Sequence, residues 1–500
     1  MNNGKICISL CAKTADDLFA KIAQAEPLAD VIEIRFDCLN PDQIDHIVEH
    51  LPLIEKTYLI TYRPSEQGGL RVLPLNARLM FWKKVLAALA DRDILVDLES
   101  DINFPFRFDE TKVIRSAHFF NDPPRDLRPA FFELAELGEG IVKLAATARD
   151  ITDTIPAWKL IETADREKRK VIPIAMGEAG KWTRILGPAH GAFMTYAALD
   201  AADATAPGQL TAADLIDVYH VKELALDTKV YGIVAGDTSY SISPWIHNPG
   251  FEAAGQNCVY LPLQVTDLDV FITLMVRPAT REVELNLAGF SVTNPHKQAI
   301  IKHLDEIDAT AEKIGAVNTV KIENGKLYGY NTDAAGFIKP LISVFGDLND
   351  AKIAIVGAGG AARSCVYALT MAGADVAVYA RDTIKAENLT DSFGVRVKSI
   401  PDTFGDCDIV VNSTPLGTKG AKEDQTIATA HQLEGVKLVY DLVYIPTETL
   451  LIREAKAAGA KTLGGLEMLI GQGAEQFKIW TGCEAPLRVM TDAVRKKLYL

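Results

Sequence analysis

Short apolar segments alternate with amphipathic segments along residues 1–225. Segments such as VIEIRF and ILVDLE are almost continuously apolar, which is typical of strands buried on both faces of a parallel sheet. Stretches such as TADDLFAKIAQAE and NARLMFWKKVLAALA lie between them and are amphipathic, as helices that cover a sheet are. The pattern predicts eight strands, at residues 5–10, 31–36, 58–63, 94–99, 112–118, 141–147, 171–177 and 191–199. Eight such units predict an α/β fold with a closed (β/α)8 barrel.

One residue of the sixth predicted strand does not fit its surroundings. The segment EGIVKLAATA places Lys143 within an apolar run, and burying an unpaired ammonium is costly. A barrel of this kind carries its active site at the carboxyl ends of the strands. We therefore expect Lys143 to face a pocket inside the mouth of the barrel.

Other polar residues fall at or near the carboxyl ends of different predicted strands. These residues are Arg35, Arg63, Glu99 and His118. Taken singly, each is more often a solvated charge at the rim or a structural residue. Because all four converge on one end of the predicted barrel, we expect them to share the pocket of Lys143.

The segment HIVEH, from His46 to His50, matches the H-x-x-E-H pattern of a group of zinc enzymes. It falls in the helix predicted after the second strand, and Pro52 follows almost at once. In a barrel this helix lies on the outer ring, away from the mouth. We therefore interpret the two histidines as part of a solvated helix face and expect no metal.

Length and charge narrow the class of protein. The 500 residues are too many for one ordinary core and predict two or three domains. The net charge of −14 argues against nucleic acid or an anionic membrane as the main partner, whereas an anionic small substrate needs only local Arg and Lys. The run ICISLCA is interpreted as a first strand rather than a signal peptide, and no apolar stretch is long enough to cross a bilayer. We expect a cytoplasmic protein.

The seven cysteines are scattered along the chain, odd in number and without a CxxC pair. This usage predicts reduced thiols, with no disulfide framework and no zinc site.

A lysine in an apolar pocket can be neutral and nucleophilic near pH 7, because desolvation disfavours the ammonium. A neutral amine attacks a ketone to form a Schiff base, which acidifies the neighbouring C–H. His118 is the candidate base for that proton, and a carboxylate such as Glu99 could fix the tautomer of the imidazole. Arginines in the same pocket would bind a substrate carboxylate.

The segments VIEIRFD, VDLES, RSAHFF, IVKLAAT, KWTRILG and TAPGQL together resemble type I 3-dehydroquinate dehydratases. The resemblance covers nearly all of residues 1–225 and implies dehydration of 3-dehydroquinate to 3-dehydroshikimate. It implies that Lys143 forms the Schiff base, that His118 is the acid and base, and that Glu99 orients His118. It places seven further residues around the substrate: Glu33, Arg35, Arg63, Met176, Arg184, Thr205 and Gln209. Gln67 stands where the family usually has Glu, and Thr205 where serine is commoner.

A polar connector at residues 221–229 precedes a new strand, VYGIVAG. In SYSISPWIHN, Ser243 followed by Pro244 predicts a helix cap with proline at the first helical position. Such a helix start suits an anionic group, although an ordinary cap explains the pattern as well. Lys297 and Asp333 lie on two separate predicted loops, and a carboxylate partner would keep the lysine charged as a proton donor. Taken alone, either of these two residues is a surface charge.

The segment KIAIVGAGGAARSCVYAL predicts a dinucleotide site. A strand runs directly into Gly357-x-Gly359-x-x-Ala362 and then into a helix, which lets a pyrophosphate approach the helix N-terminus closely. The next predicted strand ends at Arg381, where NAD enzymes usually carry an acidic residue. An arginine there favours NADP, a preference that the adjacent Asp382 weakens.

Residues 229–500 resemble shikimate dehydrogenases in the segments VTNPHK, IGAVNTV, YNTDAAGF, VGAGGAARS, NSTPLGT and GGLEMLIGQGAEQF. The resemblance implies that Lys297 and Asp333 are the catalytic pair. It implies that the substrate is held by Ser241, Ser243, Thr293, Asn318, Asp333 and Gln472, with Tyr444 nearby. It implies that NADP is held by Gly357, Ala358, Gly359, Gly360, Ala361, Ala362, Arg381, Thr383, Thr414 and Gly465.

The product implied for the first half is the substrate implied for the second. We therefore expect a bifunctional enzyme with a barrel at 1–225, a substrate domain at 229–334 joined by helices of 465–500, and a Rossmann-like NADP domain at 335–464. In this hypothesis Lys143 is a nucleophile because it is desolvated, whereas Lys297 is an acid because it is paired. Three alternatives remain: a quinate and shikimate dehydrogenase using NAD, a catalytically silent metabolite sensor, and an aldolase barrel fused to an unrelated dehydrogenase.

Overall fold

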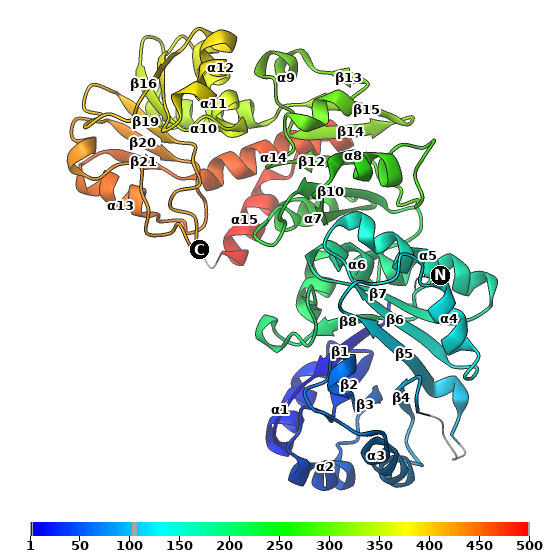
Figure 1. Cartoon of the computed structure of the whole chain (residues 1–500). Coiled ribbons are helices and arrows are strands. Elements are labelled where there is room, and N and C mark those ends of the chain that lie inside the picture. The colour runs from blue at the N-terminus through cyan, green and yellow to red at the C-terminus, as the bar shows by residue number, and fades with distance from the viewer. Residues whose placement is uncertain (1, 3, 103–107, 499–500) are drawn as a thin grey trace. The chain divides into compact units, whose positions relative to one another are not determined.

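The structure is a computed structural model (Figure 1). It describes residues 2, 4–102 and 108–498, with the side chains of 383–385, 388 and 390 excepted. The chain divides into two units. The first comprises Met1–Val230, Asp237–Pro244 and Val259–Asn286, and the second comprises Tyr231–Gly236, Trp245–Cys258 and Leu287–Leu500.

The eight strands predicted for the first half are all present and form a curled parallel sheet (Figure 1). Its strands are β1 (Ile6–Leu10), β2 (Val31–Arg35), β3 (Thr57–Thr61), β4 (Ile94–Glu99), β5 (Val113–Phe119), β6 (Ile141–Thr147), β7 (Lys170–Met176), β8 (Thr195–Ala198) and a ninth, unpredicted strand β9 (Leu210–Thr211). The order β7-β6-β5-β4-β3-β2-β1-β8-β9 is that of a (β/α)8 barrel whose ladder lies open beside β7. Just before β8, the N–H of Phe193 donates to the carbonyl of Val171 in β7 at 2.8 Å.

Helices follow most of these strands. They are α1 (Ala15–Ala25), α2 (Ile44–His50), α3 (Leu75–Ala88), α4 (Arg128–Ala135), α5 (Ile155–Arg166) and α6 (Lys181–His190). In α1 the hydroxyl of Thr14 caps the helix by accepting from the N–H of Asp17, and Leu18 and Ile22 are buried one turn apart. Between β4 and β5, the described residues contain a short 3-10 turn and no α-helix.

The residues of β6 alternate between two cores. Leu144 and Ala146 pack on the outer side with residues of α4 and α5. Ile141 and Ala145 join the apolar side chains inside the barrel. Since strand side chains alternate in direction, Lys143 belongs to the inward set. The charged residue in this buried strand therefore points into the barrel, as predicted.

The prediction that all cysteines are unpaired is wrong for two of them. Cys11, which follows β1, and Cys38, which follows β2, form a disulfide. Strands β1 and β2 are parallel neighbours, so the loops after them leave the sheet at the same end. The proximity comes from strand pairing, and a separation of 27 residues gave no local signal of it.

Helix α2 contains the HIVEH segment and ends before Leu51. His46 and His50 are exposed, their rings stack, and Nδ1 of His50 is 2.9 Å from the carbonyl oxygen of His46. Over the described part of the chain, no group of three or more His, Cys, Asp or Glu side chains could hold a metal ion.

The second sheet has six strands in the order β11-β10-β12-β14-β15-β13. They are β10 (Lys229–Ala235), β11 (Cys258–Gln264), β12 (Gly289–Val292), β13 (Glu306–Ile307), β14 (Thr319–Glu323) and β15 (Lys326–Tyr330). Strands β14 and β15 form a hairpin whose turn, Asn324-Gly325, has positive φ at both residues. The helices of this region are α7 (Pro244–Ala253), α8 (Leu268–Phe271), α9 (Ala309–Ile314) and α10 (Asp333–Phe345). Helix α7 begins at Pro244, as the Ser-Pro pattern predicts.

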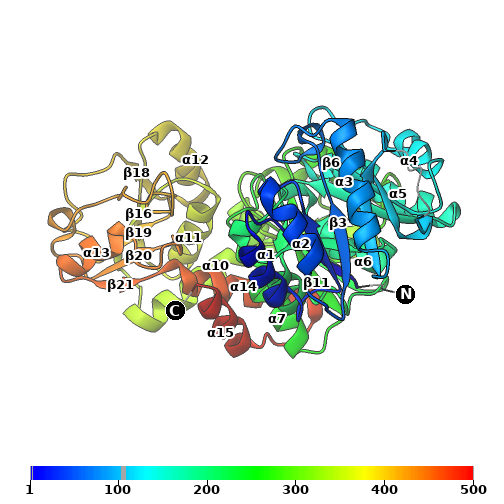
Figure 2. The same cartoon turned by 90° about the horizontal axis from the view of Figure 1, so that it is seen from below.

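The third sheet is parallel, in the order β18-β17-β16-β19-β20-β21. Its strands are β16 (Lys352–Val356), β17 (Asp375–Tyr379), β18 (Arg396–Lys398), β19 (Ile409–Asn412), β20 (Leu438–Asp441) and β21 (Lys461–Leu463), and its helices are α11 (Gly360–Met371), α12 (Thr383–Phe393) and α13 (Leu450–Ala457). Helices α11 and α12 cover one face and α13 the other (Figure 2). The order reverses between β16 and β19, which is where doubly wound sheets bind nucleotides.

Helices α14 (Gly465–Thr481) and α15 (Leu487–Lys497) end the described chain. Helix α14 returns to β14, because the indole N–H of Trp480 donates to the carbonyl of Val320 at 3.0 Å. Nε2 of Gln476 donates to the carbonyl of Asn318 at 3.3 Å.

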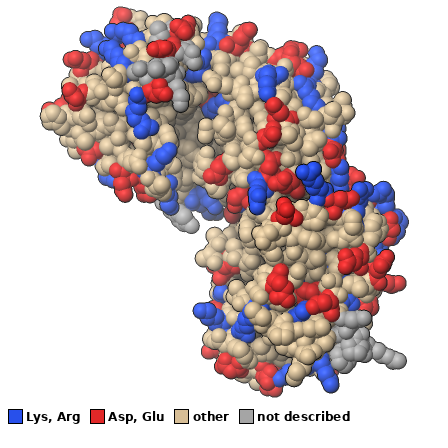
Figure 3. Space-filling view, viewed as in Figure 1, with Lys and Arg blue, Asp and Glu red and all other residues tan. Residues whose placement is uncertain are grey.

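No helix of the described residues is both long enough and apolar enough to cross a membrane. Acidic and basic side chains intermingle over the face shown in Figure 3, so the net charge of −14 is not gathered into one patch on that face.

Candidate functional site

A pocket opens inside the barrel at the carboxyl ends of its strands. Nine of the ten residues predicted for this site line it: Glu33, Arg35, Arg63, His118, Lys143, Met176, Arg184, Thr205 and Gln209. They come from six different strands or the segments that follow them, so the curled sheet brings together side chains far apart in sequence. The pocket also includes Gln67, Phe120 and Tyr196, which the sequence analysis did not assign to it.

Lys143 is 5% exposed and its ammonium is paired. Nζ lies 2.8 Å from Oδ2 of Asp97 and 4.3 Å from the centre of the Tyr196 ring. The expected burial of Lys143 is confirmed, whereas the expectation that its amine has no charged partner is wrong, because Asp97 holds it. Pairing does not distinguish Lys143 from Lys297.

Asp97 is the centre of a buried network that the sequence analysis missed. This fully buried carboxylate accepts from Arg63 Nη2 at 2.6 Å and from the Ser116 hydroxyl at 2.5 Å, in addition to Lys143. Burial alone would raise the pKa of Asp97, but the positive charges of Arg63 and Lys143 hold it well below its ordinary value. Its signal in the sequence was the same as that of Lys143, a charged residue on the inward face of a buried strand.

His118 lies two residues beyond Ser116 on β5, and its backbone N–H donates to Oε1 of Gln67 at 3.0 Å. Desolvation in the pocket, together with the charges of Arg63 and Lys143, lowers the pKa of His118 well below its ordinary value. The imidazole is therefore neutral near pH 7 and can accept a proton. Its Nδ1 is buried and has no hydrogen-bond partner among the described residues.

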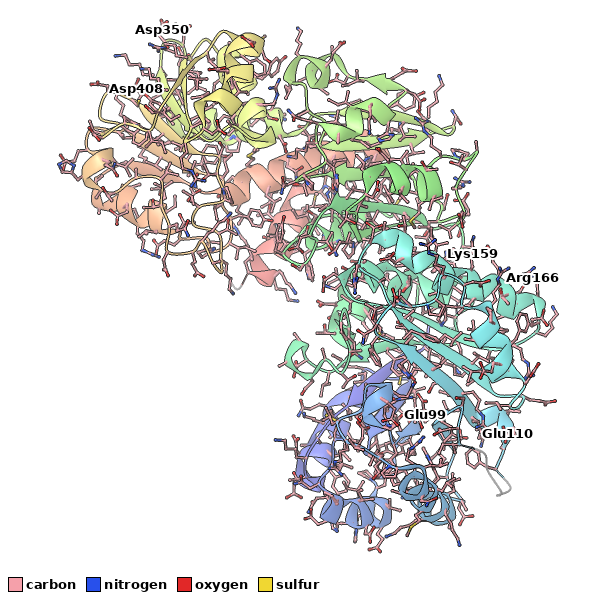
Figure 4. All side chains as sticks on the ribbon, in the orientation of Figure 1. Glu99, Glu110, Lys159, Arg166, Asp350 and Asp408 are labelled. Carbon is pink, nitrogen blue, oxygen red and sulfur yellow. A yellow bond between two sulfur atoms is a disulfide. The ribbon has the colours of Figure 1, made fainter. Side chains whose placement is uncertain are left out.

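Glu99, at the end of β4 (Figure 4), is the predicted residue that does not line the pocket. Its oxygens accept from Arg63 Nη1 at 3.2 Å and Arg78 Nη1 at 3.1 Å. Burial raises the pKa of Glu99, against the opposite effect of Arg63. The predicted contact with the His118 ring is not formed, because two arginines already occupy the carboxylate.

Arg184, on α6, is a buried cation that the structure leaves without a carboxylate partner among the described residues. Its Nη2 donates weakly to the carbonyl of Pro207 at 3.4 Å, and its Nε has no partner within the described part of the chain. Burial lowers the pKa of Arg184 to about 10. By contrast, Arg35 is already paired, through two hydrogen bonds to Asp37 at 2.8 and 2.9 Å. Arg184 is thus the pocket cation free to take an anionic group.

The remaining polar residues of the pocket are held in place by one another. Glu33 accepts from the hydroxyls of Ser9 and Thr61, the latter at 2.7 Å. The Thr205 N–H donates to Oε1 of Gln209 at 2.8 Å, which closes the turn of the TAPGQ segment. These bonds fix the side chains before any ligand arrives.

A second cluster lies in the other unit, around Lys297 and Asp333. Nζ of Lys297 is 2.5 Å from Oδ2 of Asp333, which confirms the predicted pairing of two distant segments. The other oxygen of Asp333 accepts from Asn318 Nδ2 at 2.8 Å, and the same amide group lies 3.5 Å from Oε1 of Gln472. Lys297 remains partly exposed, whereas Asp333 is buried.

Four more predicted substrate residues are placed less tightly. Ser241 and Ser243 precede α7, and their hydroxyls lie 3.2 Å apart. Thr293 follows β12, and its N–H donates to the carbonyl of Val234 at 3.0 Å. Tyr444 lines a separate hollow that also includes Gly465.

The glycine loop after β16 leaves room for a phosphate. Gly357 has a φ of +120°, and a Cβ there would lie 2.5 Å from the Ser413 hydroxyl and 3.1 Å from Thr414. Open space surrounds Gly359, and α11 starts at Gly360. Backbone N–H groups at such a helix start bind a pyrophosphate. Ala358 and Ala361 complete the loop, and Ala362 is fully buried against the sheet, as close packing of α11 requires.

Arg381 is exposed just beyond β17, the strand next to the glycine loop. The side chain of Thr383 lies outside the described residues. Gly465 begins α14, where a Cβ would be 2.2 Å from the carbonyl oxygen of Leu442. That position requires glycine for packing, whatever its role toward a cofactor.

Comparison with known proteins accords with this division of sites. The family model "Type I 3-dehydroquinase" matches residues 6–225. The models "Shikimate dehydrogenase substrate binding domain", "Shikimate / quinate 5-dehydrogenase" and "Shikimate 5'-dehydrogenase C-terminal domain" match residues 233–320, 341–442 and 465–495.

The bifunctional 3-dehydroquinate dehydratase/shikimate dehydrogenase of Arabidopsis thaliana, a chloroplastic protein, is 34% identical over 99% of this chain and 85% of its own length. The shikimate dehydrogenase (NADP(+)) of Methanocaldococcus jannaschii is 40% identical over 54% of this chain and 98% of its own. A crystal structure of a shikimate dehydrogenase in complex with NADP+ matches 55% of this chain and 97% of its own, with 39% identity and a TM-score of 0.52. The chain therefore belongs to the family of bifunctional enzymes that join a type I 3-dehydroquinate dehydratase to a shikimate dehydrogenase.

Proposed function

We propose that this chain catalyses two consecutive reactions, the dehydration of 3-dehydroquinate to 3-dehydroshikimate and the NADPH-dependent reduction of that product to shikimate. The dehydratase is assigned to residues 1–225, the substrate domain of the reductase to 229–334 with 465–500, and the NADP domain to 335–464. The observation that carries the proposal is one pocket holding a buried lysine, a neutral imidazole and an unpaired arginine. The partners in this proposal are small molecules, with neither nucleic acid nor membrane, and the location is the cytoplasm.

The dehydratase begins with covalent attachment of the substrate. The Lys143 ammonium first gives a proton to a base, and neutral His118 is the base that the pocket offers. The amine then adds to the ketone carbon, and the ketone oxygen leaves as water with one proton from the amine and one returned by the imidazolium, which gives a protonated Schiff base and neutral His118. The iminium withdraws electrons from the adjacent carbon and makes its C–H acidic.

Elimination follows on the attached substrate. His118 takes the proton from the carbon next to the iminium, and the electron pair expels the hydroxyl one carbon further along the ring. That hydroxyl leaves as water with the proton from the imidazolium, so His118 returns to its neutral state. Water then hydrolyses the conjugated iminium, which releases the enone product and the free amine.

The substrate carboxylate is assigned to Arg184, because the other pocket arginines already hold carboxylates of the protein. Glu33, Arg35, Thr205 and Gln209 would bind the ring hydroxyls. Met176 supplies an apolar wall.

Borohydride trapping tests the dehydratase proposal. Reduction of the protein in the presence of 3-dehydroquinate should attach the ring to one peptide, at Lys143. Lys143→Ala should abolish the label and the dehydratase activity but leave shikimate oxidation unchanged. Lys112→Ala, which removes a lysine from the surface of the same barrel, should be labelled like the unsubstituted protein. A label on any lysine other than Lys143 would refute the assignment.

In the reductase, Lys297 is the proposed proton donor to the ketone oxygen, and its ion pair with Asp333 orients it. Asn318, Gln472, Thr293, Ser241, Ser243 and Tyr444 are the proposed partners of the polyol. The residues of the glycine loop fit NADP, since they leave a helix start open to a pyrophosphate and Arg381 stands beyond the adjacent strand. NADPH, when bound, supplies the hydride.

Steady-state kinetics test the reductase proposal. Oxidation of shikimate and quinate with NADP+ and NAD+ gives four values of kcat/KM, and shikimate with NADP+ should exceed the other three. A higher value for quinate with NAD+ would favour the quinate dehydrogenase alternative. Binding of 3-dehydroquinate without turnover of either step would favour the sensor alternative.

A further inference from the structure

Tyr196 lines the dehydratase pocket, and the mechanism above does not use it. It lies on β8, where it pairs in register with Cys7 of β1. Its side chain belongs to the inward set of apolar residues in the barrel and is 5% exposed. The Lys143 ammonium lies over its ring, 4.3 Å from the ring centre. The ring is therefore the surface against which the amine is held.

The Tyr196 hydroxyl is buried and has no hydrogen-bond partner among the described residues. Buried tyrosine hydroxyls normally have a partner, because an unmade bond leaves the full cost of desolvation. An apolar residue of similar shape would avoid that cost. Hydrogen bonding within the free protein therefore does not explain why this position carries a hydroxyl.

A second unused donor shares this pocket. Nε of Arg184 is also buried, and no described residue offers it a partner. Arg184 and Tyr196 both line this pocket. Two buried donors, one neutral and one cationic, match the two oxygens of a carboxylate.

The Tyr196 hydroxyl is protonated at ordinary pH and can donate a hydrogen bond. Burial, with the charges of Glu33 and Asp97, raises the pKa of Tyr196 well above its ordinary value. The phenol consequently keeps its proton and is neither a base nor a nucleophile.

We propose that Tyr196 is a substrate-binding residue of the dehydratase, whose hydroxyl donates to the substrate carboxylate beside Arg184 while its ring positions Lys143. This inference rests on the proposed dehydratase function.

Tyr196→Phe isolates the hydroxyl and keeps the ring. A hydrogen bond from this neutral hydroxyl to a charged carboxylate predicts a rise of about 10- to 100-fold in KM for 3-dehydroquinate. The bond is present in both ground and transition states, so kcat should change by less than about twofold. Because the hydroxyl is unpaired in the free protein, the thermal midpoint should stay equal or rise.

Tyr58→Phe is the matched control. The Tyr58 hydroxyl, on β3 of the same barrel, donates to the carbonyl of Pro52 at 3.1 Å and lies outside the pocket. Its removal should lower the thermal midpoint and leave KM unchanged, the opposite of the pattern at Tyr196. In Tyr196→Leu, which removes the ring as well, borohydride labelling of Lys143 should slow further.

A double substitution tests the shared carboxylate. If Tyr196 and Arg184 bind one group, Tyr196→Phe should raise KM less in an Arg184→Met background than in the original protein. An unchanged KM in Tyr196→Phe, or a loss of stability like that of Tyr58→Phe, would overturn the inference. If the original protein is active and is labelled at Lys143, such a result overturns only the role of Tyr196 and leaves the proposed dehydratase function intact. If the original protein is inactive, the proposed dehydratase function itself is overturned.

Discussion

Replacing Asp97 by asparagine would leave two buried cations without their shared counter-ion. The fully buried carboxylate lies 2.8 Å from Nζ of Lys143 and 2.6 Å from Nη2 of Arg63. Asparagine has nearly the same shape, so the change removes the charge and converts one acceptor into a donor that faces ammonium or guanidinium hydrogens.

The expected loss of folding free energy depends on which carboxylate partners Lys143 and Arg63 keep in the variant. Removing one member of a buried ion pair costs about 3–5 kcal/mol. Arg63 keeps Glu99 at 3.2 Å, which places the expected loss near the lower limit, about 3 kcal/mol. A loss of that size reduces the folding equilibrium constant of the barrel about 100-fold.

The loss should depend on pH in a defined way. The pKa of Asp97 is lower in the folded protein than in the unfolded chain, so its stabilisation is complete above about pH 5 and declines as the pH falls toward the folded value. The difference between the original protein and Asp97→Asn should therefore be constant from about pH 5 upward and shrink in acid.

Urea unfolding, followed by loss of dehydratase activity at several pH values, measures the effect, with shikimate oxidation as an internal check on the second unit. Asp101→Asn is the matched control, because Asp101 pairs with Arg78 at 2.5 Å but is about half exposed. That substitution should cost less than about 1 kcal/mol. Equal stability of Asp97→Asn and the original protein would refute the argument that this carboxylate holds the pocket cations.

Three further predictions concern other parts of the two sites. Arg184→Met should raise KM for 3-dehydroquinate about 10- to 100-fold, because a charge-assisted hydrogen bond to the substrate carboxylate is lost. The same substitution should raise the thermal midpoint of unfolding, because it removes an unpaired buried cation, and a lower midpoint would contradict that reasoning. Lys297→Met should lower kcat of shikimate oxidation at least 100-fold while dehydratase kinetics stay unchanged, and a smaller loss would mean that another group carries the proton. Arg381→Ala should raise KM for NADP+ about tenfold or more without changing KM for NAD+. Initial rates with both nucleotides measure this, and equal effects on the two KM values would show that Arg381 does not bind the 2′-phosphate.

The strands of this chain were predictable because a strand that is buried on both faces requires a continuous local run of apolar residues. The segment at 94–99 coincides with β4 and that at 141–147 with β6. The ninth strand, Leu210–Thr211, is two residues long and carries no such run. The disulfide between Cys11 and Cys38 was missed for another reason, because the pairing of β1 with β2 brings those loops together.

The functional residues likewise divide into those that a local sequence pattern reveals and those that depend on contacts between distant strands. Lys143 could be found from the sequence because an ammonium stands out in a buried strand, and position and resemblance together identified its neighbours in the pocket. Its ion pair with Asp97 could not be found, since β4 and β6 are separated by β5 and contact between them depends on the curl of the sheet. Glu99 illustrates the converse error: its place at the end of a predicted strand and the family resemblance suggested it as the partner of His118, but the structure directs its oxygens to two arginines.

The tight approach between Gly360 and Lys297 has a consequence for protein engineering. A side chain at position 360 would begin 3.3 Å from Cδ of the lysine, within the aliphatic stem that carries the proposed acid. A library that randomises the glycine loop to change nucleotide preference would, at this position, simultaneously select on proton delivery. At position 360, the preference for one nicotinamide nucleotide and the turnover number cannot be optimised independently. Changes in nucleotide preference should be sought at Arg381 and Asp382 instead.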